Sequence, residues 1–85
     1  TRFLGRFGDR IRWVDVRFTD VNGPRGGVDT RSRIEAHIEP LGTVIGQATH
    51  ETALQAVRAA VDKVTSAATR RIDRLERRRR SLAVG

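Results

Sequence analysis

The chain contains no cysteine, so neither a disulfide framework nor a thiolate metal site can form. It also has no run of about 20 apolar residues, which excludes a transmembrane helix. Its first residues lack both the apolar core of a signal peptide and a starting methionine, which is compatible with a cytoplasmic protein and with a fragment of a longer chain. Only Trp13 and three phenylalanines are aromatic, so we do not expect base stacking to be the main mode of any nucleic-acid binding.

Arginine is the abundant residue. The 85 residues carry 17 Lys+Arg against 10 Asp+Glu, a net charge of +7, and Lys63 is the only lysine. The guanidinium group forms bidentate contacts with phosphate, and a basic domain of this kind predicts a polyanion as its partner. A base-composition bias of the genome is the alternative explanation for arginine in place of lysine. The excess lies toward the C-terminus, where residues 50–85 hold nine cations and four acids.

Alternation of apolar and polar residues predicts two strands, over residues 11–19 and 30–39. Residues 43–48 are compatible with a third, shorter strand after a turn at residues 40–42. We expect the charged faces of the first two strands to pair across the sheet. The side chains expected to be buried in these strands are Val14, Val16, Phe18, Ser32, Ile34, Ala36 and Ile38.

A long helix is predicted over residues 49–80, with Thr49 as its N-cap. We expect the sheet to cover its first half, so that the arginine-rich end, residues 70–80, projects or packs elsewhere, and we expect residues 81–85 to be frayed. The apolar spacing of residues 1–8 is typical of the end of an earlier helix. The prediction is a single α+β domain over residues 1–85, with an antiparallel sheet and a helix across one face. The apolar stripe of the long helix comprises Leu54, Val57, Val61, Val64, Ala68, Ile72 and Leu75.

The glycine-rich stretch VNGPRGGVDT, residues 21–30, has two interpretations: a phosphate-binding loop or a hairpin turn. A P-loop needs Gly-Lys-Ser/Thr and a following helix, and this stretch has neither. Asn-Gly and Gly-Gly with an intervening proline are turn sequences. We therefore predict a hairpin connection, with Arg25 at its tip placed to meet a backbone phosphate.

Catalytic and metal-binding patterns are weak. His37 lies on an exposed strand face and His50 near the start of the helix, and neither lies in a triad context. His37 and Glu39 offer only two metal ligands on one strand. We predict no enzyme activity, no metal and no cofactor.

The basic end of the helix is the most specific feature. Its arginines recur at i, i+1, i+4, i+7 and i+8, which places them on one stripe of a helix and gives a spacing suited to phosphates. A merely solvated helix end, partly neutralised by Asp73 and Glu76, is the alternative. The stripe consists of Arg70, Arg71, Arg74, Arg77 and Arg78, extended toward the sheet by Arg58 and Lys63.

Two segments, VDVRFTDVNGPRGGVDTRSRIEAHIE and TALQAVRAAVDKVTSAATRRIDRLERRR, resemble the family of ribosome hibernation-promoting factors and ribosome-associated translation inhibitors, also described as sigma-54 modulation protein-like. The resemblance runs from about Ile11 to Arg80. One subgroup shares the turn reproduced by residues 22–29. In the helix, the family's motif of Asp-Lys-hydrophobic and then a basic end corresponds to residues 62–64 followed by Arg70 and Arg71.

The resemblance implies a β-α-β-β-β-α fold with both helices on one face, of which the first strand and most of the first helix are absent here. It implies a cytoplasmic protein that binds the small ribosomal subunit in the channel for messenger and transfer RNA, and silences translation under stress. It leaves the oligomeric state open, a homodimer included. The residues that would contact ribosomal RNA phosphates are Lys63, Arg70, Arg71 and Arg74.

Several positions depart from the family pattern. Arg58 replaces an acid, and Thr30 and Ser32 replace the Lys and Cys common in the subgroup. Two other functions remain open. A double-stranded RNA-binding module has a similar order of elements, but its basic contacts start the last helix, where this chain reads THETALQ. The other alternative is a helix-mediated protein-assembly module that uses Leu75 and the projecting helix.

Overall fold

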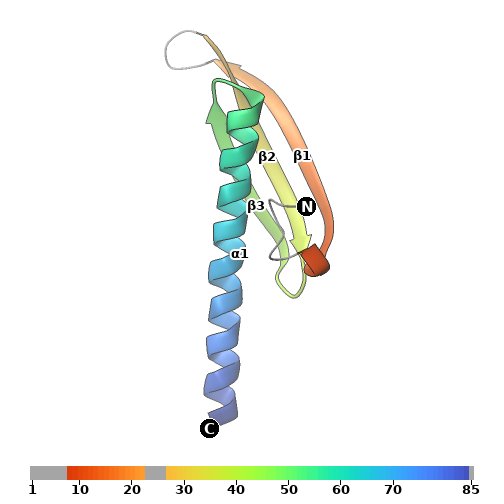
Figure 1. Cartoon of the computed structure of the whole chain (residues 1–85), viewed down its shortest axis with the longest axis vertical. Coiled ribbons are helices and arrows are strands. Elements are labelled where there is room, and N and C mark those ends of the chain that lie inside the picture. The colour runs from red at the N-terminus through yellow and green to blue at the C-terminus, as the bar shows by residue number, and fades with distance from the viewer. Residues whose placement is uncertain (1–7, 23–26, 85) are drawn as a thin grey trace.

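Three antiparallel strands and one helix make up the described part of the chain, residues 8–22 and 27–84 of this computed structural model (Figure 1). The strands form one sheet in the order β1-β2-β3, and α1 lies across one face of it. This architecture confirms the predicted α+β fold. The elements are β1 (Ile11–Asn22), β2 (Val28–Ile38), β3 (Gly42–His50) and α1 (Ala53–Val84).

Each strand pairs antiparallel with the next one along the chain. β1 and β2 are antiparallel from Ile11↔Ile38 up to Asn22↔Val28, so the glycine-rich stretch is a hairpin connection, as predicted. Residues 23–26, with Arg25 among them, lie outside the described residues. The second turn is closed by the Leu41 amide, which donates to the Ile38 carbonyl oxygen at 2.7 Å, and Gly42 takes a left-handed φ of 85° there.

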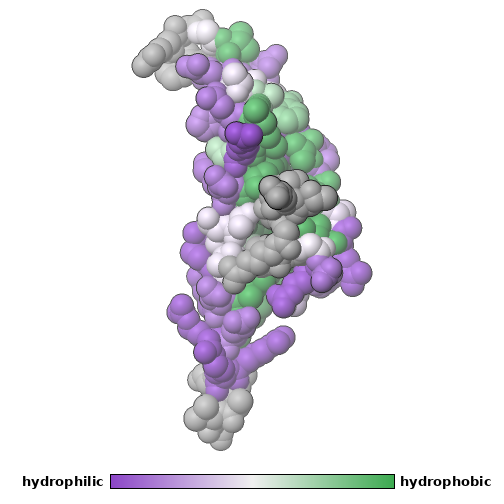
Figure 2. Space-filling model, in the orientation of Figure 1, coloured by the Kyte–Doolittle hydropathy of each residue, from purple (hydrophilic) through white to green (hydrophobic). Residues whose placement is uncertain are grey.

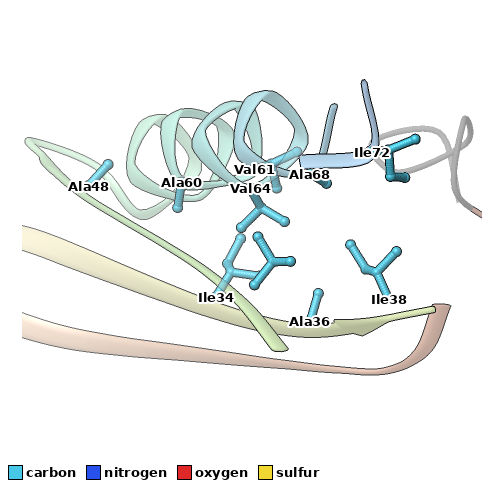
Figure 3. Close-up of a cluster of buried hydrophobic side chains, with 10 residues drawn as sticks. Ile34, Ala36, Ile38, Ala48, Ala60, Val61, Val64, Ala68 and Ile72 are labelled. Atoms are coloured by element: carbon cyan, nitrogen blue, oxygen red, sulfur yellow. The ribbon is translucent and has the colours of Figure 1, made fainter. Parts of the chain in front are cut away.

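The core lies between the helix and the two strands β2 and β3 (Figure 3). Ile34, Ala36 and Ile38 point from β2 toward the helix, as their alternation predicts. Small residues dominate the helix side of this layer. The buried helix residues are Ala56, Ala60, Val61, Val64, Ala68 and Ile72.

Gly46 in the middle of β3 lies directly under the helix. A Cβ at this position would be 2.5 Å from the Ala60 carbonyl oxygen and 2.7 Å from Val64 Cγ2. No side chain fits that space, so glycine permits the helix to pack against the strand. The alanines of the buried helix face have the same effect, and together they hold α1 close to the sheet.

The helix begins at Ala53, and the prediction of Thr49 as its N-cap is wrong. The ladder between β2 and β3 continues to Thr30↔His50, so Thr49 belongs to β3. Thr52 is the cap: its Oγ1 accepts a hydrogen bond from the Gln55 amide at 3.2 Å and donates to Gln55 Oε1 at 3.2 Å.

The other end of the helix also differs from expectation. α1 runs to Val84, so residues 81–84 are helical and not a frayed tail. β2 and β3 are longer than predicted, and the helix stays in the core as far as Ile72, so the projecting part starts after Leu75 and not at Arg70. Leu54, expected in the apolar stripe, is 58% exposed. The helical end predicted for residues 1–8 falls almost entirely outside the described residues, with Gly8 in a 3₁₀ turn at residues 8–10.

Candidate nucleic-acid interface

The last part of α1 carries the densest positive charge of the molecule. Residues 70–80 hold seven arginines and two acids, a net charge of +5 over about three turns. Figure 2 shows hydrophilic side chains spreading from this end of the helix. The arginines exposed there are Arg70, Arg74, Arg77, Arg78, Arg79 and Arg80.

Three of the predicted phosphate ligands border a groove at the turn between β2 and β3. Arg71, Arg74 and Arg78 follow one another at i, i+3 and i+7, so they lie along one side of the helix. With Pro40 and Leu41 they line an open space of about 310 Å³. Guanidinium groups around a groove of this kind can hold a phosphate from more than one side.

Arg71 and Lys63 have a second role that the sequence did not reveal. Lys63 Nζ donates to the Gln47 carbonyl oxygen at 2.8 Å. Arg71 donates to the carbonyl oxygens of Leu41 at 3.0 Å and Thr43 at 3.4 Å. Both cations therefore fasten the helix to the backbone of β3, whereas Arg70, Arg74, Arg77 and Arg78 have no such contact among the described residues.

Three further arginines, Arg17, Arg31 and Arg33, lie with two acids on the sheet face away from the helix. The register sets Arg17 opposite Arg33, and Thr19 opposite Arg31. Asp15 and Glu35 are opposite each other as well, so the expected pairing of unlike charges across the two strands is wrong at these positions. The sequence could have placed these arginines on one face, because each of them alternates with the buried residues of its strand. Which residues lie opposite each other also requires the hairpin register.

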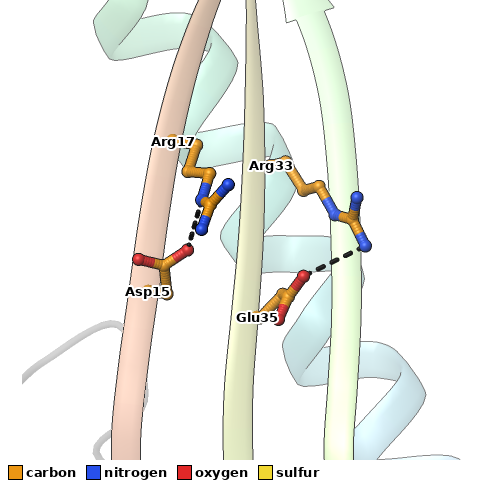
Figure 4. Close-up of polar contacts among 4 residues, drawn as sticks. All are labelled: Asp15, Arg17, Arg33 and Glu35. Atoms are coloured by element: carbon orange, nitrogen blue, oxygen red, sulfur yellow. Dashed lines mark hydrogen bonds and ion pairs between the residues drawn. The ribbon is translucent and has the colours of Figure 1, made fainter.

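Ion pairs on this face form within each strand, because like charges face each other across it (Figure 4). Arg17 Nε is 2.8 Å from Asp15 Oδ2, and Arg33 Nη2 is 3.0 Å from Glu35 Oε1. The four side chains are 33–77% exposed, so each pair contributes little to stability. Their main effect is to neutralise two of the arginines locally.

Trp13 lies on the same open face, as its alternation with the buried residues predicts. Its ring is stacked on that of His37, with centroids 6.0 Å apart. His37 Nε2 is also 3.4 Å from Glu39 Oε1, and Arg12 Nε is 3.6 Å from the same oxygen. His37 and Glu39 thus share a surface cluster with an arginine and an indole, which is not a metal-binding arrangement.

The described ranges, 8–22 and 27–84, contain no group of three potential metal ligands from His, Asp or Glu. His50 is exposed at the end of β3, on another part of the sheet from His37. No helix in those ranges is long and apolar enough to cross a membrane. Comparison with known proteins yields no relative: no family model, no curated protein and no solved structure matches the chain.

Proposed function

We propose that this chain binds the small ribosomal subunit through ribosomal RNA phosphates and silences translation by occupying the channel for messenger and transfer RNA. The observation that supports binding is the exposed arginine stripe at the end of α1. The resemblance to ribosome hibernation factors supports the choice of the ribosome as the polyanion. Such a protein acts in the cytoplasm, needs no cofactor and catalyses no reaction.

The stripe suits RNA phosphates for two reasons. Arg70, Arg74 and Arg77 recur at steps of four and three residues, so they share the solvent side of one helix. Guanidinium groups contact phosphate bidentately, and neutralisation of several phosphates releases counterions. We assign these three arginines and Arg78 to direct phosphate contact. We assign Lys63 and Arg71 chiefly to holding the helix on β3, with their charge contributing to the same field.

Co-sedimentation with purified small subunits tests the ribosomal target, with a plain RNA duplex as competitor. We expect the chain to pellet with the subunits and to remain there when duplex is added. Release by the duplex in proportion to its phosphate concentration would contradict the proposal and favour the double-stranded RNA-binding alternative. Absence from the pellet at low salt would favour the protein-assembly alternative.

A salt titration tests the stripe. The triple variant Arg70→Gln, Arg74→Gln, Arg77→Gln should flatten the slope of log affinity against log salt by about 2–3 units, since each lost phosphate contact removes about 0.7–0.9.

A matched control variant has the same net charge as the triple variant of the stripe. Replacing Arg17, Arg31 and Arg33 by Gln removes three charges from the open sheet face instead. We expect its slope to remain close to that of the unaltered chain. Equal slopes for the two triple variants would mean that net charge, and not the position of the stripe, determines binding.

A further inference from the structure

β1 is an edge strand with its outer side open. Within the described part of the chain it pairs with β2 alone, and it extends over twelve residues. The other edge of the sheet is different, because Lys63 and Arg71 donate to the β3 carbonyls of Gln47 and Thr43. Cations at an edge prevent a further strand from pairing there. No such contact covers β1 within residues 8–22 and 27–84, so only this edge offers a free ladder.

The side chains of β1 on the helix side are also uncovered. α1 packs on β2 and β3 and stops short of β1. As a result Val14, Val16 and Phe18, expected in the core, are 36%, 40% and 53% exposed. Figure 2 shows hydrophobic surface along this side of the molecule. An open groove of about 630 Å³ runs between Val16 on the strand and Val57 on the helix.

The β1 sequence is self-complementary about Val16. In an antiparallel pair with a two-fold axis at this residue, Asp15 faces Arg17 of the other copy on the open face. Val14 faces Phe18 on the helix face, and Val16 faces itself. Opposite charges and apolar pairs directly across an antiparallel ladder are both stabilising. The irregularity in the ladder between Ile11 and Trp13 marks where this regular stretch ends.

Neighbouring registers lose this match. A two-fold axis at Asp15 sets two aspartates against each other, and an axis at Arg17 sets two arginines against each other. An axis at Val14 or at Phe18 separates Asp15 from Arg17. A register that pairs odd with even residues is not two-fold symmetric, because it puts the two helices on opposite faces and separates the apolar strips. Val16 is therefore the centre that satisfies charge and hydrophobicity together.

We propose that β1 is a homodimerisation edge: two copies of this chain pair antiparallel through β1, centred on Val16, into one continuous six-stranded sheet. Both helices then lie on the same face, and the exposed strips of Val14, Val16 and Phe18 become neighbours. The two strands run in opposite directions, so the arginine-rich helix ends lie at opposite ends of the sheet and repel each other least. This proposal does not rest on the proposed function.

A single engineered cysteine tests the centre of the dimer, because the chain has no other. Residues directly opposite in an antiparallel pair have Cα atoms about 4.5–5.5 Å apart, within the range of a disulfide. Val16→Cys should therefore give a disulfide-linked dimer under mild oxidation. Ile45→Cys is the matched control, a similarly exposed aliphatic position on β3 that lies far from the proposed axis. Equal cross-linking of the two variants would overturn the proposal.

Charge reversal tests the register. Asp15→Arg alone and Arg17→Asp alone each create two like-charge pairs across the axis, and should weaken the dimer at least about tenfold. The double variant restores opposite charges and should restore the dimer. Glu35→Arg is the matched control, since it breaks the same kind of ion pair within a strand, in β2 and away from the edge.

The mass in solution is measured by sedimentation velocity over a dilution series, with circular dichroism to verify folding. We expect the unaltered chain to approach twice the 9.5 kDa of one copy. A monomer at every concentration would overturn the proposal and leave the edge to another occupant. A dimer that Asp15→Arg leaves intact would overturn it as well. If a charge variant does not fold, the Val16→Cys result decides alone.

Discussion

Replacement of Gly46 by alanine is the most direct test of how closely the helix packs against the sheet. Ordinary van der Waals contact begins at 3.4 Å, whereas the added Cβ would lie 2.5 Å from the Ala60 carbonyl oxygen and 3.0 Å from the Val64 amide nitrogen. Both are backbone atoms of α1, so no side-chain rotation can relieve the overlap. The helix must move away from β3 by about 1 Å, which forfeits a quarter to a half of the dispersion energy along the contact.

The expected magnitude follows from these distances. Overpacking of a closed core typically costs about 1–3 kcal/mol, and the backbone contacts place this site in the upper half of that range. Alanine regains about 0.5–1 kcal/mol relative to glycine in a strand, so the net loss in the free energy of unfolding is about 2 kcal/mol. For a domain of this size that corresponds to a fall in Tm of about 8–16 °C.

Thermal unfolding followed by circular dichroism measures the effect. Gly27→Ala is the control, because a Cβ at Gly27 meets nothing within 4 Å and the residue has no left-handed φ. We expect its Tm to match or slightly exceed that of the unaltered chain. Equal Tm values for Gly46→Ala and Gly27→Ala would refute the close packing of α1 against β3.

Three further substitutions test local features. Ser32→Ala should raise the free energy of unfolding by about 1 kcal/mol in urea titration, because the buried Ser32 hydroxyl has no hydrogen-bond partner in the described structure; destabilisation would reveal a partner. Thr52→Ala should cost about 1 kcal/mol by the same assay while Thr49→Ala costs less, and the reverse order would contradict the cap at Thr52. Lys63→Met should lower stability by less than about 1 kcal/mol and increase aggregation in light scattering, since it opens the β3 edge; unchanged scattering would contradict that role.

The alternation of apolar and polar residues was enough to predict the sheet and its buried face. Ser32, Ile34, Ala36 and Ile38 are all buried, because period-two alternation places side chains on one face whatever the partner strands are. Val14, Val16 and Phe18 obey the same period and lie on the same face. Their exposure was not predictable, since it depends on where α1 crosses the sheet, and helix periodicity does not fix that position.

Boundaries and pairings were less predictable for similar reasons. Thr49 and Thr52 are both good caps, and only the length of the β2–β3 ladder decides between them. Alternation assigns the charged residues of β1 and β2 to the open face of the sheet. It does not show which of them lie opposite each other, because that follows from the register of the two strands. Among the candidate RNA ligands, Arg71 and Arg70 cannot be told apart in the sequence, and only the fold shows that Arg71 donates to the backbone of the β2–β3 turn and of β3.

The unequal support of α1 along its length has a consequence for backbone dynamics. Amides between Ala56 and Ile72 are held by the core and should exchange with solvent only when the whole domain opens. Amides beyond Leu75 have no sheet beneath them, and neighbouring arginines there repel one another, so those turns should open locally and exchange faster. A bound polyanion neutralises that repulsion. Ligand binding and the ordering of the last turns are therefore thermodynamically linked, and hydrogen exchange of the terminal amides would report occupancy.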